Sequence, residues 1–218
     1  MLQKSTLDFL KALKKNNNRE WFAQNKNAYE AARQNVIDFA QPLVDAMAKK
    51  NPALKGLDAK KLVMRIYRDI RFSKDKTPYK TNFGISVTPT GKMEYNAGFY
   101  LHIEPGKSFV AGGRYMPIPP ALKAIRQEIE YNTKEFKSII NNKAFKKHFG
   151  TLSPMKLKTS PKGYAKDHPD LELFKYTSYI VEHSLDDKLV LSNKLIPTCA
   201  QSYAAMLPLL NFLNEATQ

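Results

Sequence analysis

The spacing of hydrophobic residues changes twice along this chain, and those changes constrain the fold most. Up to residue 59 the apolar residues recur every three or four positions, which is typical of amphipathic helices. From Leu62 to Gly113 they alternate with polar residues, as in strands that bury one face. From Pro119 onward the helical spacing returns, apart from a strand-like run over 178–185. The order helix, strand, helix predicts an α+β fold.

The alternation predicts a central antiparallel β-meander of about four or five strands, flanked by helices at both chain ends. One strand is expected over 93–104, where apolar and polar side chains alternate: Phe99, Leu101 and Ile103 against Tyr100, His102 and Glu104. One face of the sheet is therefore expected to pack and the other to stay polar. The remaining strands are expected over 62–72, 83–87, 108–113 and 178–185.

These elements are expected to form a single domain over 1–218, because no linker-like stretch interrupts the chain. The long helix expected over 19–50 contains Pro42, which should kink it or divide it in two. The expected organisation is helical in 1–59, β-meander in 60–116, and helical with a basic loop and one strand in 117–218.

The composition is that of an ordinary globular domain, with 218 residues of which 43% are hydrophobic and 25% charged. No apolar stretch reaches the roughly 18–20 residues of a membrane span, and the first residues do not resemble a signal peptide. Cys199 is the only cysteine, which excludes an internal disulfide and predicts a small buried side chain. The four histidines are scattered, so no metal site is predicted, and no motif indicates a cofactor or an oligomeric state. We expect a cytoplasmic protein without a membrane partner.

The positive charge is concentrated in two windows. Residues 60–80 contain eight basic and two acidic side chains, and residues 143–166 contain seven basic and none acidic. The windows therefore carry +6 and +7 of a net charge of +15. Concentrated charge creates a local potential that attracts anions, whereas scattered charge mainly favours solubility. The alternative is that these lysines simply lie on solvated loops.

The polar face of the expected meander is the first candidate site. Arginine suits planar, bidentate recognition of carboxylate or phosphate, and Asp69 could hold Arg65 and Arg71 in place, which would lower the pKa of Asp69. Asp69, His102 and Glu104 are the candidates for acid–base chemistry, although nothing in the sequence reveals a reaction. The alternative is a salt-bridged, solvated sheet face. The other candidate ligand-binding residues on this face are Tyr67 and Tyr100.

Two loops and a glycine pair provide further candidates. The loop 73–82 carries Lys74, Lys76, Tyr79 and Lys80, and the loop 157–169 carries Lys158, Lys162 and Tyr164. Tyrosines interleaved with lysines resemble the stacking surfaces of single-strand nucleic-acid binders, but ordinary packing is the simpler interpretation. Arg114 follows two adjacent glycines, which permit close backbone approach to a ligand or merely form a turn.

Four segments resemble the signature segments of a bacterial and fungal family, domain of unknown function 2461. They are NNNREWFAQNKNAYE (16–30), RIYRDIRFSKDKTPYKTNFG (65–84), GFYLHIEPGKSFVAGGRYMP (98–117) and LKTSPKGYAKDHPDLELFK (157–175). The resemblance spans nearly the whole chain. It implies one cytoplasmic domain and implies no activity, so no catalytic residue is carried over.

The sequence is compatible with three functions. The first is a binding protein or enzyme whose basic, aromatic-lined cleft accommodates an anionic, phosphate-bearing ligand, with both charged windows converging on one side of the fold. The second is a nucleic-acid-binding protein that uses 60–80 and 143–166 as an electrostatic track. The third is a protein-interaction module whose acidic C-terminal third contacts a basic partner.

Overall fold

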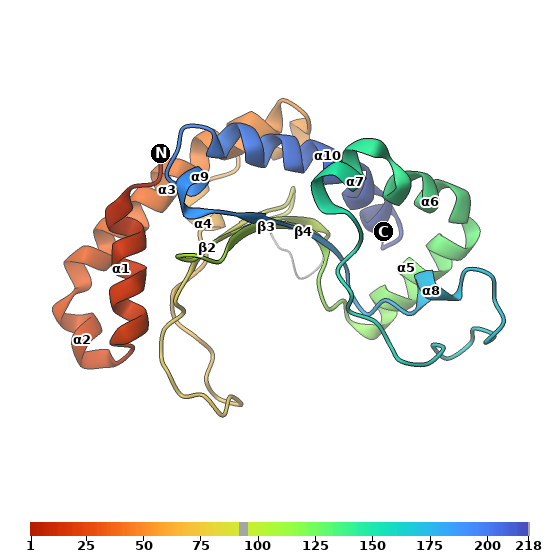
Figure 1. Ribbon diagram of the computed structural model, residues 1–218, viewed down its shortest axis with the longest axis horizontal. Helices are drawn as coiled ribbons and strands as arrows, with labels where there is room; N and C mark the ends of the chain where they lie inside the picture. The colour runs from red at the N-terminus through yellow and green to blue at the C-terminus, as the bar shows by residue number, and fades with distance from the viewer. Residues whose placement is uncertain (92–95, 218) are drawn as a thin grey trace. The chain divides into compact units, whose positions relative to one another are not determined.

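The computed structural model describes residues 1–91 and 96–217, with helices at both chain ends and an antiparallel sheet between them (Figure 1). The sheet order is β1-β2-β3-β4. The predicted α+β fold with a central meander and flanking helices is therefore confirmed. The strands are β1 (Phe83–Val87), β2 (Gly98–Ile103), β3 (Ser108–Arg114) and β4 (Tyr179–Leu185). The expected start of the second of these at residue 93 lies outside the described residues.

The chain forms two compact units. The first comprises Met1–Val87, Tyr100–Val110 and Ser184–Gln201. The second comprises Thr88–Phe99, Ala111–His183 and Ser202–Gln218. The single domain expected over 1–218 stays a prediction.

The helices of the first unit begin with α1 (Lys4–Lys15) and α2 (Arg19–Gln24). Asn18 caps α2 by accepting a hydrogen bond from the backbone N–H of Trp21 at 2.9 Å. Of the two expected effects of Pro42, a kink or a division, the division does not occur: α3 runs from Lys26 to Ala48 with Pro42 inside it, and the helical run is interrupted at Asn25 instead. Leu43 and Val44 beside the proline are buried, and this packing outweighs the lost backbone hydrogen bond. Short helices follow at η1 (Pro52–Leu54), α4 (Ala59–Leu62) and α9 (Asp187–Val190).

The second unit packs its helices around an aromatic centre. The ring of Phe136 lies 6.1 Å from that of Tyr179 and 5.2 Å from that of Phe212. Its elements are α5 (Pro119–Tyr131), α6 (Thr133–Asn141), α7 (Lys143–Phe149), α8 (Leu171–Phe174) and most of α10 (Leu195–Glu215). Within the described ranges, none of the helices combines the length and apolarity needed to cross a bilayer.

The strand predicted over 62–72 does not form, and that prediction is wrong. The segment 63–82 forms two isolated antiparallel β-bridges instead, Val63 with Ile85 and Tyr67 with Tyr79. Figure 1 shows this segment as the tan ribbon that leaves the sheet between α4 and β1. Residues 68–72 do not pair with a neighbouring strand, so their apolar side chains have no sheet face to pack on. Phe72 is 95% exposed as a result.

Candidate functional site

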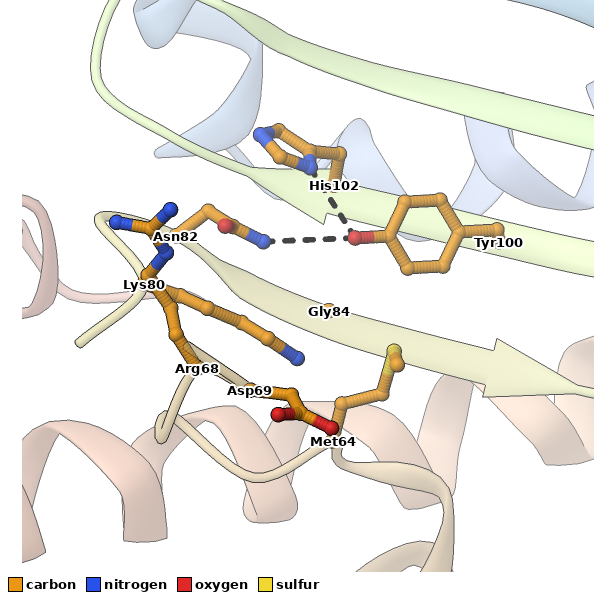
Figure 2. Close-up of a pocket in the computed structure, with 8 residues that line it drawn as sticks. All are labelled: Met64, Arg68, Asp69, Lys80, Asn82, Gly84, Tyr100 and His102. Atoms are coloured by element: carbon orange, nitrogen blue, oxygen red, sulfur yellow. Dashed lines mark hydrogen bonds between the residues drawn. The ribbon is translucent and has the colours of Figure 1, made fainter. Parts of the chain in front are cut away.

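A pocket of about 400 Å³ lies in the first unit, bounded by β1, β2 and the segment 63–82 (Figure 2). We call it the β2 pocket. The polar face of β2 forms its floor, and the segment 63–82, which we call the ribbon, forms one side. Its lining residues are Met64, Arg68, Asp69, Lys80, Asn82, Gly84, Tyr100 and His102.

Two polar side chains of β2, Tyr100 and His102, form a hydrogen-bonded chain with Glu104, which directly follows the strand. Tyr100 Oη lies 3.1 Å from His102 Nδ1, and His102 Nε2 lies 3.2 Å from Glu104 Oε2. Residues two apart in a strand point to the same face, which brings the three together. The intervening Leu101 and Ile103 are fully buried on the other face. The alternation predicted for this strand is thus confirmed.

Glu104 ends this row of hydrogen bonds and is itself held by two further contacts. Its Oε1 accepts a hydrogen bond from Thr81 Oγ1 at 3.3 Å and faces Lys14 Nζ of α1 at 3.4 Å. Burial alone would raise the pKa of Glu104, but the hydrogen bonds from His102 and Lys14 outweigh it, so the pKa is lowered. Glu104 therefore stays an anion at neutral pH.

The environment of His102 keeps the imidazole neutral. Burial lowers its pKa, and the opposing influence of Glu104 is smaller. Phe109 of β3 stacks on the ring, with centroids 4.6 Å apart and planes at 12°. Since a carboxylate can only accept, Glu104 takes the Nε2–H, and Nδ1 is left to accept the O–H of Tyr100.

Gly84 makes room for Tyr100. A Cβ at Gly84 would come within 2.7 Å of Tyr100 Oη and 2.8 Å of its Cε2. The phenol thus lies over the backbone of β1, where Asn82 Nδ2 donates to its oxygen at 3.4 Å. Burial raises the pKa of Tyr100, which keeps the hydroxyl protonated.

Two of the three charged residues that line the pocket are already paired. Arg68 binds Asp75 and Thr77 within its own ribbon. Asp69 holds Arg71 in a bidentate pair, with Oδ1–Nε at 3.0 Å and Oδ2–Nη2 at 2.7 Å. The hydrogen bonds from Arg71 lower the pKa of Asp69 to about 2, as the sequence predicted in direction.

Lys80 is the remaining charge. Its side chain extends into the pocket between Asp69 and Asn82 (Figure 2), and the residue is half-buried. In the described part of the chain, no carboxylate forms an ion pair with it. Burial lowers the pKa of Lys80, and the nearby charge of Arg65 lowers it further.

Comparison with models of known families shows which family the chain belongs to. A family model described as "Conserved hypothetical protein (DUF2461)" matches residues 5–212. The chain belongs to this family. The comparisons with curated proteins and with solved structures found no match. Of the residues that line the β2 pocket of this DUF2461 member, only Met64 falls outside the segments 65–84 and 98–117 that carry the resemblance.

The predicted residues of the first unit separate into three groups. Asp69, Lys80, Tyr100 and His102 line the pocket, and Glu104 adjoins it. Tyr79 is 6% exposed and stacks on Phe22 at 3.9 Å, with Tyr67 against the same cluster. Arg65, Arg71, Lys74 and Lys76 are exposed. Sequence reasoning missed Met64, Arg68, Asn82 and Gly84 as lining residues; a glycine inside a strand was the available signal.

The other candidates lie in the second unit. Lys158 and Lys162 are exposed, and Tyr164 stacks on Phe174 at 4.4 Å. Arg114 is 3% exposed, and among the described residues its Nε and Nη1 have no hydrogen-bond partner. The convergence of both charged windows on one cleft stays a prediction. In the residues that the structure describes, no cluster of His, Cys, Asp or Glu could hold a metal ion.

Proposed function

We propose that the protein binds a small anionic, phosphate-bearing molecule in the β2 pocket, as a binding protein or as an enzyme. The observation that carries the proposal is Lys80, a half-buried ammonium without a carboxylate partner in the described part of the chain. Desolvating a cation is unfavourable unless a counter-charge compensates, and a bound anion would supply it. The volume of about 400 Å³ suits a small molecule.

The charge balance favours an anion over a cation. Asp69 is neutralised by Arg71, and Glu104 is hydrogen-bonded by His102 and Lys14. Among the described residues, the nearby charges that form no ion pair are therefore positive: Lys80, and Arg65 close enough to lower its pKa. The half-buried position of Lys80 strengthens its attraction for an anion relative to the same charge in open water.

Two polar groups could orient such a ligand. The amide of Asn82 donates to Tyr100 Oη over a long 3.4 Å, so a stronger acceptor would readily redirect it. The hydroxyl of Tyr100 lies beside it and can also donate. With Lys80 supplying charge and these two groups supplying direction, the pocket has the elements of a specific phosphate site.

A thermal-shift panel of nucleotides, phosphosugars and polyphosphates tests the proposal. A ligand at about a hundredfold its dissociation constant adds ~2.7 kcal/mol to the stability of the wild-type protein. We expect Lys80→Met to lower the affinity of any such ligand at least about tenfold, while Lys74→Met, on the exposed part of the same ribbon, changes it little. The absence of any stabilising anion, or equal losses in both variants, contradicts a specific site.

Nucleic-acid binding is the second candidate, and Phe72 is the observation that favours it. Its ring is 95% exposed, and the Arg71 guanidinium lies 5.9 Å from its centroid. Exposed aromatics beside cations provide stacking surfaces for single strands. This function predicts that Phe72→Ala weakens oligonucleotide binding several-fold, whereas a small ligand in the β2 pocket is unaffected by that change. Fluorescence anisotropy with a labelled oligonucleotide separates the two.

A further inference from the structure

We propose that anion binding in the β2 pocket is coupled to the uptake of one proton, which resides on His102 Nδ1 and is linked to the anion through the hydroxyl of Tyr100. The inference rests on the function proposed above and assigns that site a proton-linked ligand. It follows from the direction of the hydrogen bonds along β2.

In the structure, the phenolic proton of Tyr100 forms a hydrogen bond inside the protein. Glu104 accepts the Nε2–H of His102 over 3.2 Å, so Nδ1 carries a lone pair. Tyr100 must then donate its O–H to Nδ1 over 3.1 Å, while its oxygen accepts from Asn82. The hydroxyl is thus directed at His102 rather than at the pocket.

An anion reverses that direction. A sulfate or a fully ionised phosphate offers only acceptors, so Tyr100 can bind it only by turning its O–H toward it. The oxygen of Tyr100 and the lone pair of His102 Nδ1 would then face each other at 3.1 Å without a proton between them. One proton from solvent on Nδ1 restores the bond, with His102 donating and Tyr100 accepting. No covalent bond of the protein breaks, and the pocket gains one positive charge.

The charges around His102 permit this change. Glu104, directly after β2, favours the imidazolium form, and it stays ionised because the hydrogen bonds from His102 and Lys14 outweigh the effect of burial on its pKa. Burial opposes a positive charge on His102, which agrees with a neutral imidazole in the structure, and Lys80 lines the same pocket. A dianion beside Lys80 offsets that opposition. Asp69 is compensated by Arg71, and Phe109 on β3 carries no charge.

The sign of the linkage follows directly. If the anion raises the pKa of His102, binding is strongest below the pKa of the free protein. It weakens as the pH rises through the pKa of the complex and is constant above it. A rise of one pKa unit corresponds to a tenfold difference in affinity between the two plateaus.

Sulfate is the probe, because it does not titrate between about pH 5 and 9, so any proton taken up belongs to the protein. Long-range proton–nitrogen spectra of the labelled protein follow the ring nitrogens of His102, which His102→Gln identifies. Sodium chloride keeps the ionic strength constant. We expect saturating sulfate to raise the pKa of His102 by at least about one unit, and sulfate to bind at least about tenfold tighter at low pH.

Two variants isolate the route. Tyr100→Phe removes the link but keeps the ring, and His102→Gln removes the titrating group. In both variants we expect sulfate to bind more weakly and with no dependence on pH through this window. Circular dichroism checks that each variant is folded, and the wild-type titration stands by itself if one is not.

The outcomes separate the two proposals. If sulfate binds and Lys80→Met abolishes binding, but the affinity and the pKa of His102 do not change together, the proton linkage is wrong and the anion site remains. If sulfate does not bind, or binds independently of Lys80, both proposals fail. If Tyr100→Phe keeps the full pH dependence, the proton does not depend on Tyr100 and the proposed route is overturned.

Discussion

Gly84 lies directly beneath the phenol of Tyr100, so close that a Cβ atom would come within 2.7 Å of Tyr100 Oη. The backbone of β1 and the ring on β2 therefore share a space that no larger residue can enter. This relationship positions the hydroxyl that joins Asn82 to His102.

Replacing Gly84 with alanine should displace the Tyr100 ring. We expect Gly84→Ala to destabilise the protein by about 1–3 kcal/mol, as overpacking in a filled site does. It should also weaken anion binding, because the hydroxyl leaves its position. Urea denaturation and ligand titration measure the two effects. In a Tyr100→Ala background the stability cost of Gly84→Ala should nearly vanish, and an unchanged cost there would show that the ring is not the obstacle.

Tyr79 should behave as a core residue. Its ring is 6% exposed and stacks on Phe22, and its backbone exchanges two hydrogen bonds with Asn17 at 3.1 and 2.9 Å. We expect Tyr79→Ala to cost about 3–5 kcal/mol of unfolding free energy, like other large aromatic truncations. Tyr67→Ala, at a ring that is half-exposed, should cost about 1 kcal/mol. Chemical denaturation of both variants decides it, and near-equal losses would place Tyr79 outside the core.

The pair of Asp69 and Arg71 makes a prediction about pH. The Arg71 hydrogen bonds lower the pKa of Asp69 from 3.8 to about 2. The pair therefore stabilises the folded state fully at pH values above 3.8, and this stabilisation is lost as the pH falls through about 2. We expect Arg71→Gln to return the pKa of Asp69 toward its ordinary value, and Arg71→Lys to do so in part, because lysine lacks the planar fork. Carbon NMR of the side-chain carboxyl measures this directly. An Asp69 pKa that ignores both substitutions would contradict the bidentate contact.

The alternation of apolar and polar residues predicted the strands correctly where each strand has neighbouring strands to pair with. Leu101 and Ile103 alternate with Tyr100 and His102, and β2 keeps this alternation because it is paired with β1 on one side and β3 on the other. The same pattern failed over 62–72, because a strand also needs a partner, and no partner is encoded locally. Phe72 shows the result most clearly.

The candidate site was predicted in part for the same reason. His102 and Tyr100 were placed on the polar face of their strand, and Lys80 was among the loop cations. Arg68 was not among the predicted site residues, because the alternation over 62–72 does not reveal the turn that brings Asp75 and Thr77 to its guanidinium. The position of Gly84 beneath Tyr100 depends on strand register, which a single sequence leaves open.

In the proposed anion site, the Lys80 ammonium is the cationic partner of the bound anion. Carbon-labelled lysine spectra report the pKa of Lys80 without altering the protein, with Lys80→Met identifying its signal. In the free protein we expect that pKa below the ordinary 10.5, because burial and Arg65 lower it. Sulfate should raise it by about one unit or more, while Lys74 on the exposed ribbon shifts little. A Lys80 pKa that sulfate leaves unchanged, or that moves only as much as that of Lys74, would contradict an anion site in the β2 pocket.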